Sequence, residues 1–168
     1  MTKEGPKDPN TQVPNQEVEQ AARSSKFVAY LQLVRLPNVF TAIADITAGF
    51  VFVSAQGDLA PLASFVCLLL ASSLLYMAGM VLNDLFDVEQ DANERPERPI
   101  PSGRVSRSAA STLGWSMLVA GIAVAWVAGY VPGGDSAGIP WRSGVIASLL
   151  AICIVAYDAI MKRTPAGP

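Results

Sequence analysis

The chain has 168 residues, of which 51% are hydrophobic and 15% charged, and its mean hydropathy is +0.36. This balance is too apolar for an ordinary soluble domain of this length and indicates a protein surrounded by membrane lipids, while a formal net charge of −2 gives no support for a nucleic-acid partner. Histidine is absent, so the commonest general base is excluded and any chemistry must use carboxylates, Arg, Lys, Tyr or a hard metal ion.

The first 25 residues are polar, contain three prolines and lack the apolar centre of a secretory signal peptide. We expect residues 1–25 to form a disordered cytoplasmic tail, followed by a membrane domain over residues 26–168.

Four segments are long and apolar enough to cross a bilayer as helices. The first is interrupted by Arg35-Leu36-Pro37-Asn38, and a proline disfavours helical backbone in the residue before it, so we predict a short interfacial helix and then a span. The predicted spans cover about residues 39–55, 61–82, 109–131 and 143–161. The sequence thus predicts an all-α membrane protein, whose two cysteines, Cys67 and Cys153, lie in apolar runs and act as small hydrophobic residues.

Basic residues are distributed unevenly about these spans. Eleven of the twelve lie before the first span, between the second and third, or after the fourth, and only Arg142 lies on the other side. Because cytoplasmic loops are enriched in Lys and Arg, both termini and the loop after the second span are predicted to be cytoplasmic, in an integral protein of the cell (inner) membrane.

Acidic residues cluster at the end of the second span. If the helix continues, Asp84, Asp87 and Asp91 share one face, with Asn83 one turn before Asp87. Like charges on one helix face repel, so the face must be solvated or must bind a cation. Oxygen ligands favour Mg²⁺, which commonly bridges carboxylates to substrate phosphates. The alternative is a solvated acidic loop without a ligand.

Two arginines follow the aspartates, and each precedes a proline. Because the residue before a proline is extended, Arg95 and Arg98 are expected in a structured turn, where their guanidinium groups suit phosphate oxygens. Anchoring by the positive-inside rule would explain the arginines but neither the prolines nor the aspartate spacing. Aspartates for Mg²⁺ beside arginines for phosphate indicate a diphosphate site.

The stretch Asn83-Asp84-x-x-Asp87-x-x-x-Asp91-x-x-x-Arg95-Pro96-x-Arg98-Pro99-x-x-Ser102-Gly103-x-x-Ser106 resembles the first aspartate-rich motif of the UbiA family of intramembrane prenyltransferases. Two weaker matches accompany it, namely Arg35-Leu36-Pro37-Asn38 before the first span and Tyr157-x-x-x-x-Lys162-Arg163-Thr164-Pro165 at the end of the fourth.

The resemblance implies Mg²⁺-dependent transfer of an isoprenyl group from its diphosphate to an aromatic or lipid acceptor, with the isoprenyl chain in a lipid-facing tunnel. The implied metal-binding residues are Asn83, Asp84, Asp87 and Asp91. The implied diphosphate contacts are Arg35, Asn38, Arg95, Arg98 and Lys162, although snorkelling at a helix end explains Lys162 equally well. Asp45 and Tyr157 are candidates for the acceptor pocket; Asp45, inside a span, can equally be a hydrogen-bonded structural residue.

The sequence departs from the family pattern, which has about nine spans and a second aspartate-rich motif. The only aspartates after Asp91 in this sequence are Asp135 and Asp158, and neither belongs to such a motif. We therefore expect a truncated chain, equivalent to the first half of the family bundle, that binds Mg²⁺-diphosphate weakly and turns over little. The alternatives are a small four-span membrane protein for transport or assembly, with an acidic cation-binding or docking loop, and a non-catalytic remnant.

Overall fold

A computed structural model describes residues 25–55, 62–131 and 138–159 of the chain, in which helices are joined by turns and loops, with no strand among these residues. A helical segment over residues 25–33 precedes the named elements. These are η2 (Leu36–Asn38), α2 (Val39–Ala55), α3 (Leu62–Phe86), α4 (Val88–Glu94), α5 (Arg107–Tyr130) and α6 (Arg142–Ala159). Four helices are long and apolar enough to cross a membrane, which confirms the predicted fold class. The predicted tail and Lys162 lie outside the described residues.

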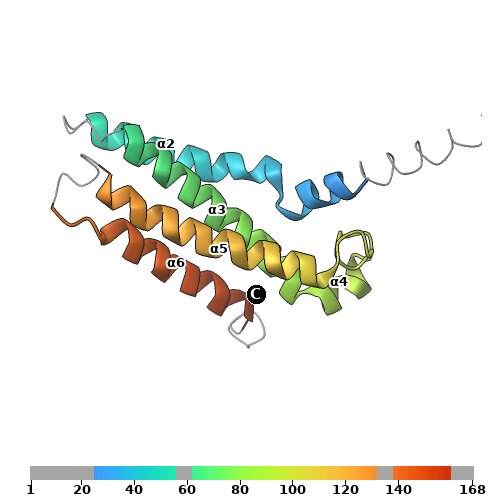
Figure 1. Cartoon of the computed structure of the whole chain (residues 1–168). Coiled ribbons are helices and arrows are strands. Elements are labelled where there is room, and N and C mark those ends of the chain that lie inside the picture. Colours follow the sequence, from blue (N-terminus) through green and yellow to red (C-terminus); the bar gives the residue numbers. More distant parts are fainter. Residues whose placement is uncertain (1–24, 56–61, 132–137, 160–168) are drawn as a thin grey trace, which may run out of the picture.

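The chain turns sharply between the 25–33 segment and α2. Arg35 adopts a left-handed backbone conformation, with φ 49° and ψ 49°, and the three-residue helix η2 follows it. Pro37 lies in η2 and cannot donate a backbone hydrogen bond, so a continuous α-helix is interrupted here. The helix restarts at Val39, leaving the 25–33 segment at an angle to α2 (Figure 1).

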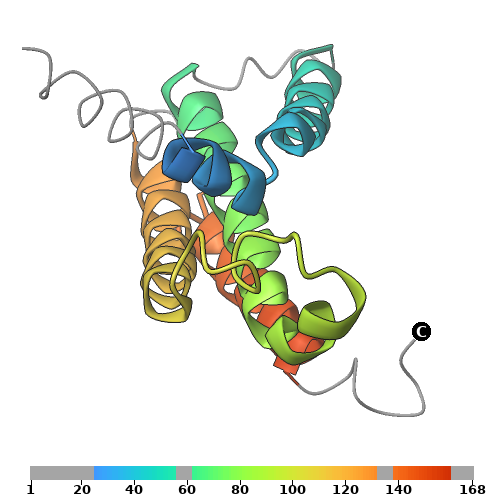
Figure 2. The same ribbon diagram turned by 90° about the vertical axis from the view of Figure 1, so that its right-hand side faces the viewer.

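Helix α3 is the centre of the bundle. Its most extensive contacts are with α5, and it also packs against α2 and α6 (Figures 1 and 2). The buried residues of α5 are small apart from Leu118; the others are Ala110, Gly114, Gly121, Ala125 and Ala128. Without side chains at Gly114 and Gly121, the backbones of the two helices approach closely: a Cβ at Gly121 would lie 2.9 Å from Leu75 Cγ. Small residues of this kind promote helix association in lipid because they let the helix backbones pack closely. Lipid tails are as apolar as the helix surface, so the hydrophobic effect does not drive the helices together.

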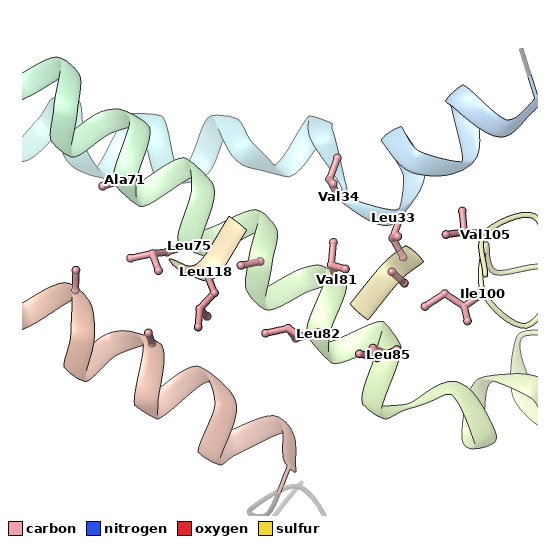
Figure 3. Packing of buried hydrophobic residues seen from close by; sticks show 14 of the residues in the cluster. Leu33, Val34, Ala71, Leu75, Val81, Leu82, Leu85, Ile100, Val105 and Leu118 are labelled. Atoms are coloured by element: carbon pink, nitrogen blue, oxygen red, sulfur yellow. The ribbon is translucent and has the colours of Figure 1, made fainter. Parts of the chain in front are cut away.

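The end of the bundle where α3 ends and α5 begins is called the motif end. Here the loop 95–106 packs beneath the 25–33 segment: Ile100 and Val105 from the loop lie near Leu33, Val34 and the α3 residues Val81, Leu82 and Leu85 (Figure 3). The side chain of Ser106 caps α5 by accepting a hydrogen bond from the backbone N–H of Ala109 at 3.2 Å. The loop is therefore held to the bundle by buried side chains.

Candidate functional site

The aspartate-rich stretch continues the register of α3 beyond its last residue. Asp87, with φ −91° and ψ 4°, separates α3 from α4, yet its N–H donates to Asn83 O at 3.0 Å and Asp91 N–H donates to Asp87 O at 2.8 Å. Helical spacing is thus kept from Asn83 to Asp91. Asp84 and Asp91 are buried and contact Arg98 of the loop, whereas Asp87 is half-buried and contacts Asn83.

Two arginines neutralise the buried aspartates. Arg98 Nη1 donates to Asp84 Oδ1 at 3.3 Å and to Asp91 Oδ2 at 2.5 Å. Arg35 Nη2, from the turn before α2, donates to the same Oδ1 of Asp84 at 2.9 Å. Charged groups this deeply buried are tolerated only when they are paired and hydrogen-bonded. The network joins the loop after α4 to α3 and α4, and joins both to the turn before α2, which is 49 residues from Asp84 in the sequence.

Arg104 holds the loop from its other end. Its guanidinium group donates to Gln32 Oε1 at 2.8 Å and to the Glu97 carbonyl at 2.6 Å, and its Nε donates to Ser102 Oγ at 3.1 Å. A hollow of about 390 Å³ opens beside it, which we call the arginine hollow. Its lining residues are Gln32, Arg35, Asp84, Glu97, Arg98, Pro99 and Arg104. Three guanidinium groups therefore line one small hollow.

A second hollow of about 410 Å³ lies between α3 and α6, and we call it the helix cleft. Its lining residues are Arg35, Gly79, Met80, Asn83, Cys153, Ile154, Tyr157 and Asp158. Arg35 lines both hollows, so they adjoin at this residue. Asn83 Nδ2 donates to Asp87 Oδ2 at 3.3 Å, which brings the amide and the carboxylate together at the mouth of the helix cleft.

An apolar crevice of about 470 Å³ continues along the same helix faces. On α3 it is lined by Leu68, Ser72 and Leu75, and on α6 by Ser143, Ile146 and Leu150. These α3 positions continue to Gly79 and Asn83 at helical spacing, and those of α6 continue to Cys153 and Tyr157. The crevice and the helix cleft share no lining residue but follow one another along the same faces of α3 and α6. We call the two together the groove; it covers about 22 Å from Leu68 to Asn83 at the helical rise.

The structure brings together most, but not all, of the residues singled out from the sequence. Arg35, Asn83, Asp84, Asp87, Asp91, Arg98 and Tyr157 gather at the motif end. Arg95 and Asn38 are exposed, and Asp45 is exposed on α2 and lines neither hollow. Asp158 was not predicted as a site residue, yet it is buried, 5% exposed, and lines the helix cleft.

The aspartate-rich stretch itself supplies oxygen ligands, from the side chains of Asn83, Asp84, Asp87 and Asp91. Among the described residues, no three His, Cys, Asp or Glu side chains converge closely enough to hold a metal ion. Arg98 forms ion pairs with both Asp84 and Asp91. Asn83 and Asp87 each carry side-chain oxygen, and their side chains meet through Nδ2 of Asn83. Oxygen ligands suit a hard cation such as Mg²⁺, which takes one or two protein ligands together with water and phosphate. The donor chemistry therefore fits Mg²⁺ through this pair.

Sequence comparison decides which family of proteins carries this arrangement. Residues 44–168 match the family model described as the UbiA prenyltransferase family. The chain belongs to this family. This confirms the resemblance seen in the aspartate-rich motif, and it makes the chain an integral membrane protein of a prenyltransferase family.

Relatives in this family include digeranylgeranylglyceryl phosphate synthases from archaea. The chain is 32% identical over 141 residues to that of Ignicoccus hospitalis, covering 84% of the chain and 41% of the relative. It is 34% identical to that of Saccharolobus solfataricus, covering 81% and 44%, and 42% identical over 101 residues to that of Methanoregula boonei, covering 60% and 32%. The chain thus spans less than half the length of these relatives.

One solved structure supports the fold. It is titled "Structural and mechanistic insights into the biosynthesis of Digeranylgeranylglyceryl phosphate synthase in membranes", and it matches with a TM-score of 0.69 and 24% identity over 82% of this chain and 44% of its own. The arrangement of helices is therefore that of a membrane prenyltransferase.

Proposed function

We propose that the chain provides the diphosphate-binding face for transfer of an isoprenyl group from an isoprenyl diphosphate to a lipid acceptor. The observation that carries this proposal is the meeting of Arg35 and Arg98 with the motif aspartates where the groove between α3 and α6 reaches the motif end. The names of the relatives favour a prenylated glycerol phosphate as the acceptor over an aromatic compound.

We assign the metal to the motif. Asn83 and Asp87 would hold Mg²⁺, with Asp84 and Asp91 completing the acidic face. Bound there, the ion would offset negative charge that develops on the leaving diphosphate. In our proposal Arg35 and Arg98 bind the diphosphate oxygens through N–H groups of their planar guanidinium forks. Arg95, Asn38 and Lys162 would add contacts at the rim.

The groove provides a place for the isoprenyl chain. It runs from Asn83 along Gly79, Leu75 and Leu68 and is lined mostly by apolar side chains. Its length of about 22 Å is most of the roughly 30 Å hydrocarbon thickness of a bilayer, enough for an extended chain of several isoprene units. Tyr157 and Asp158 lie where the reacting carbon would meet the acceptor, and they are our candidates for acceptor contacts in place of Asp45.

The test is Mg²⁺-dependent binding of geranylgeranyl diphosphate to the chain in lipid nanodiscs. We expect Asp87→Asn to weaken this binding by about 10- to 100-fold, because it removes the charge of a metal ligand. Glu89→Gln is the matched control, since Glu89 is exposed on α4 and lines neither hollow.

Two comparisons of binding affinity test the proposed function further. Geranylgeranyl diphosphate should bind more tightly than inorganic pyrophosphate, since its chain buries apolar carbon in the groove. Equal affinity of Asp87→Asn and the unmodified chain for geranylgeranyl diphosphate, at any Mg²⁺ concentration, would contradict the proposed function.

A further inference from the structure

Asp84 differs from the other motif aspartates in what it contacts. Its Oδ1 accepts hydrogen bonds from two guanidinium groups, Arg35 at 2.9 Å and Arg98 at 3.3 Å, and its side chain is only 6% exposed. Asp87, by contrast, lies beside the amide of Asn83. Two residues of the same type, one turn apart, thus have different neighbours.

We propose that Asp84 is a positioning residue, which holds Arg35 and Arg98 for binding diphosphate, and that it is not a ligand of the metal. This inference rests on the proposed function and narrows it, since the motif was expected to use all of its aspartates for the metal.

The two arginines need such an anchor because they come from separate segments. Arg35 lies in the turn before α2, and Arg98 lies in the loop after α4. Neither segment is part of α3. The Arg104–Gln32 hydrogen bond and the buried cluster hold the two segments together, and a contact shared by Arg35 and Arg98 holds their guanidinium groups beside each other. One carboxylate oxygen that accepts from both supplies that contact.

The geometry also leaves the arginines able to bind a ligand. Among the described residues, the hydrogen bonds to Asp84 and Asp91 use Nη2 of Arg35 and Nη1 of Arg98, while each guanidinium group has five N–H donors. The two positive charges beside Asp84 Oδ1 repel a divalent cation from that oxygen. The cation is better placed at Asp87, toward the helix cleft.

A simpler role for Asp84 would be to cancel the positive charge of the arginines. The two roles predict opposite effects of Asp84→Asn. Loss of a charge that only competes with the ligand would tighten pyrophosphate binding, whereas loss of a positioning contact weakens it. The sign of the change therefore separates them.

The experiment measures two affinities on each variant of the chain in nanodiscs. Mn²⁺ alone, followed by electron paramagnetic resonance, reports the metal site, and inorganic pyrophosphate at saturating Mg²⁺ reports the arginines. We expect the Mn²⁺ affinity of Asp84→Asn to be within about twofold of that of the unmodified chain. Pyrophosphate should bind about tenfold or more weakly to this variant, which is the usual effect of losing hydrogen bonds to charged groups. Asp87→Asn should lose Mn²⁺ binding, and Glu89→Gln should change neither affinity.

Arg98→Lys and Arg35→Lys make the test independent of whether Asp84→Asn folds. Both keep the positive charge but lose the planar fork, and both should weaken pyrophosphate binding without changing the Mn²⁺ affinity. If Asp84→Asn folds, the double variant with Arg98→Lys should lose less free energy of pyrophosphate binding than the sum of the losses in the two single variants, because the two residues act through one contact.

Three results would overturn the inference: loss of Mn²⁺ binding in Asp84→Asn, unchanged or tighter pyrophosphate binding in that variant, or unchanged pyrophosphate binding in both lysine variants. Other results would contradict the proposed function itself. These are retained Mn²⁺ affinity in Asp87→Asn, or no Mg²⁺-dependent pyrophosphate binding by the unmodified chain.

Discussion

Arg35 has a backbone conformation that is unfavourable for its residue type. With φ 49° and ψ 49° it lies in the left-handed region, where the Cβ of an L-residue approaches the following carbonyl oxygen at a cost of about 1–2 kcal/mol. The conformation persists because the turn directs the chain from the 25–33 segment into α2 and the side chain binds Asp84. A strained residue retained in this way is consistent with a role in binding.

This strain predicts an order of stability for two variants at position 35. Arg35→Ala and Arg35→Gly both lose the ion pair with Asp84, but only glycine relieves the left-handed strain. We expect Arg35→Gly to be more stable than Arg35→Ala by about 1 kcal/mol, measured as the free energy of unfolding in mixed micelles. Equal stabilities would show that the turn relaxes once the arginine is removed.

The sequence predicted part of the site at this scale. The spacing of Asp84, Asp87 and Asp91 placed them in one helical register because helical periodicity is a local property. The contact of Arg35 with Asp84 joins residues 49 positions apart and depends on how the turn before α2 packs, which spacing does not specify. Asp158 was missed for the same reason: it is a single carboxylate on an apolar helix, and only packing brings it to Asn83.

Helix α3 extends past the point where hydropathy predicted the end of the span. The predicted span ended at about Leu82 because Asn83 and Asp84 are polar, whereas α3 continues to Phe86. The helix can continue because Arg35 and Arg98 pair with the carboxylate of Asp84. Hydropathy treats each residue alone, and so it does not register a charge that is neutralised by a distant partner.

The contact between α3 and α5 depends on glycines, and this predicts opposite effects at two positions. A Cβ at Gly121 would lie 2.9 Å from Leu75 Cγ and 3.2 Å from the Ala71 carbonyl oxygen, whereas a Cβ at Gly49 on α2 meets nothing within 4 Å. We expect Gly121→Ala to destabilise the bundle by about 1–3 kcal/mol through overpacking. Gly49→Ala should stabilise it by up to about 1 kcal/mol through helix propensity.

The measurement is the unfolding free energy of each variant in the same micelle, with far-ultraviolet circular dichroism to confirm helix content. A stabilised Gly121→Ala variant would mean that α3 and α5 can separate slightly without loss, and that the small-residue face of α5 is not needed for tight packing.

All the groups that bind charge in our proposal lie at one end of the whole molecule. Helices α3 and α6 run toward the motif end, and α2 and α5 begin there (Figure 1). The arginines, the aspartates and Tyr157 therefore gather at one end of the bundle. Arg142, at the start of α6, lies at the opposite end. A polar site at one end of an apolar groove allows a diphosphate to stay in water while its chain enters the bilayer.

The distribution of charge predicts which side of the membrane this end faces. In the sequence, eleven of the twelve basic residues lie before the first span, between the second and third spans, or after the fourth. The motif end should therefore be cytoplasmic, where soluble Mg²⁺ and diphosphates are available. In a chain carrying Cys67→Ser and Cys153→Ser, we expect Ala92→Cys on α4 to be labelled by a membrane-impermeant thiol reagent only in inside-out vesicles. Ile139→Cys, which is exposed before α6, should be labelled only in right-side-out vesicles. Reversed labelling of the pair would place the site outside the cell and would remove the supply of its substrates, whereas labelling of Ala92→Cys from both sides would show that the charge asymmetry does not fix one orientation.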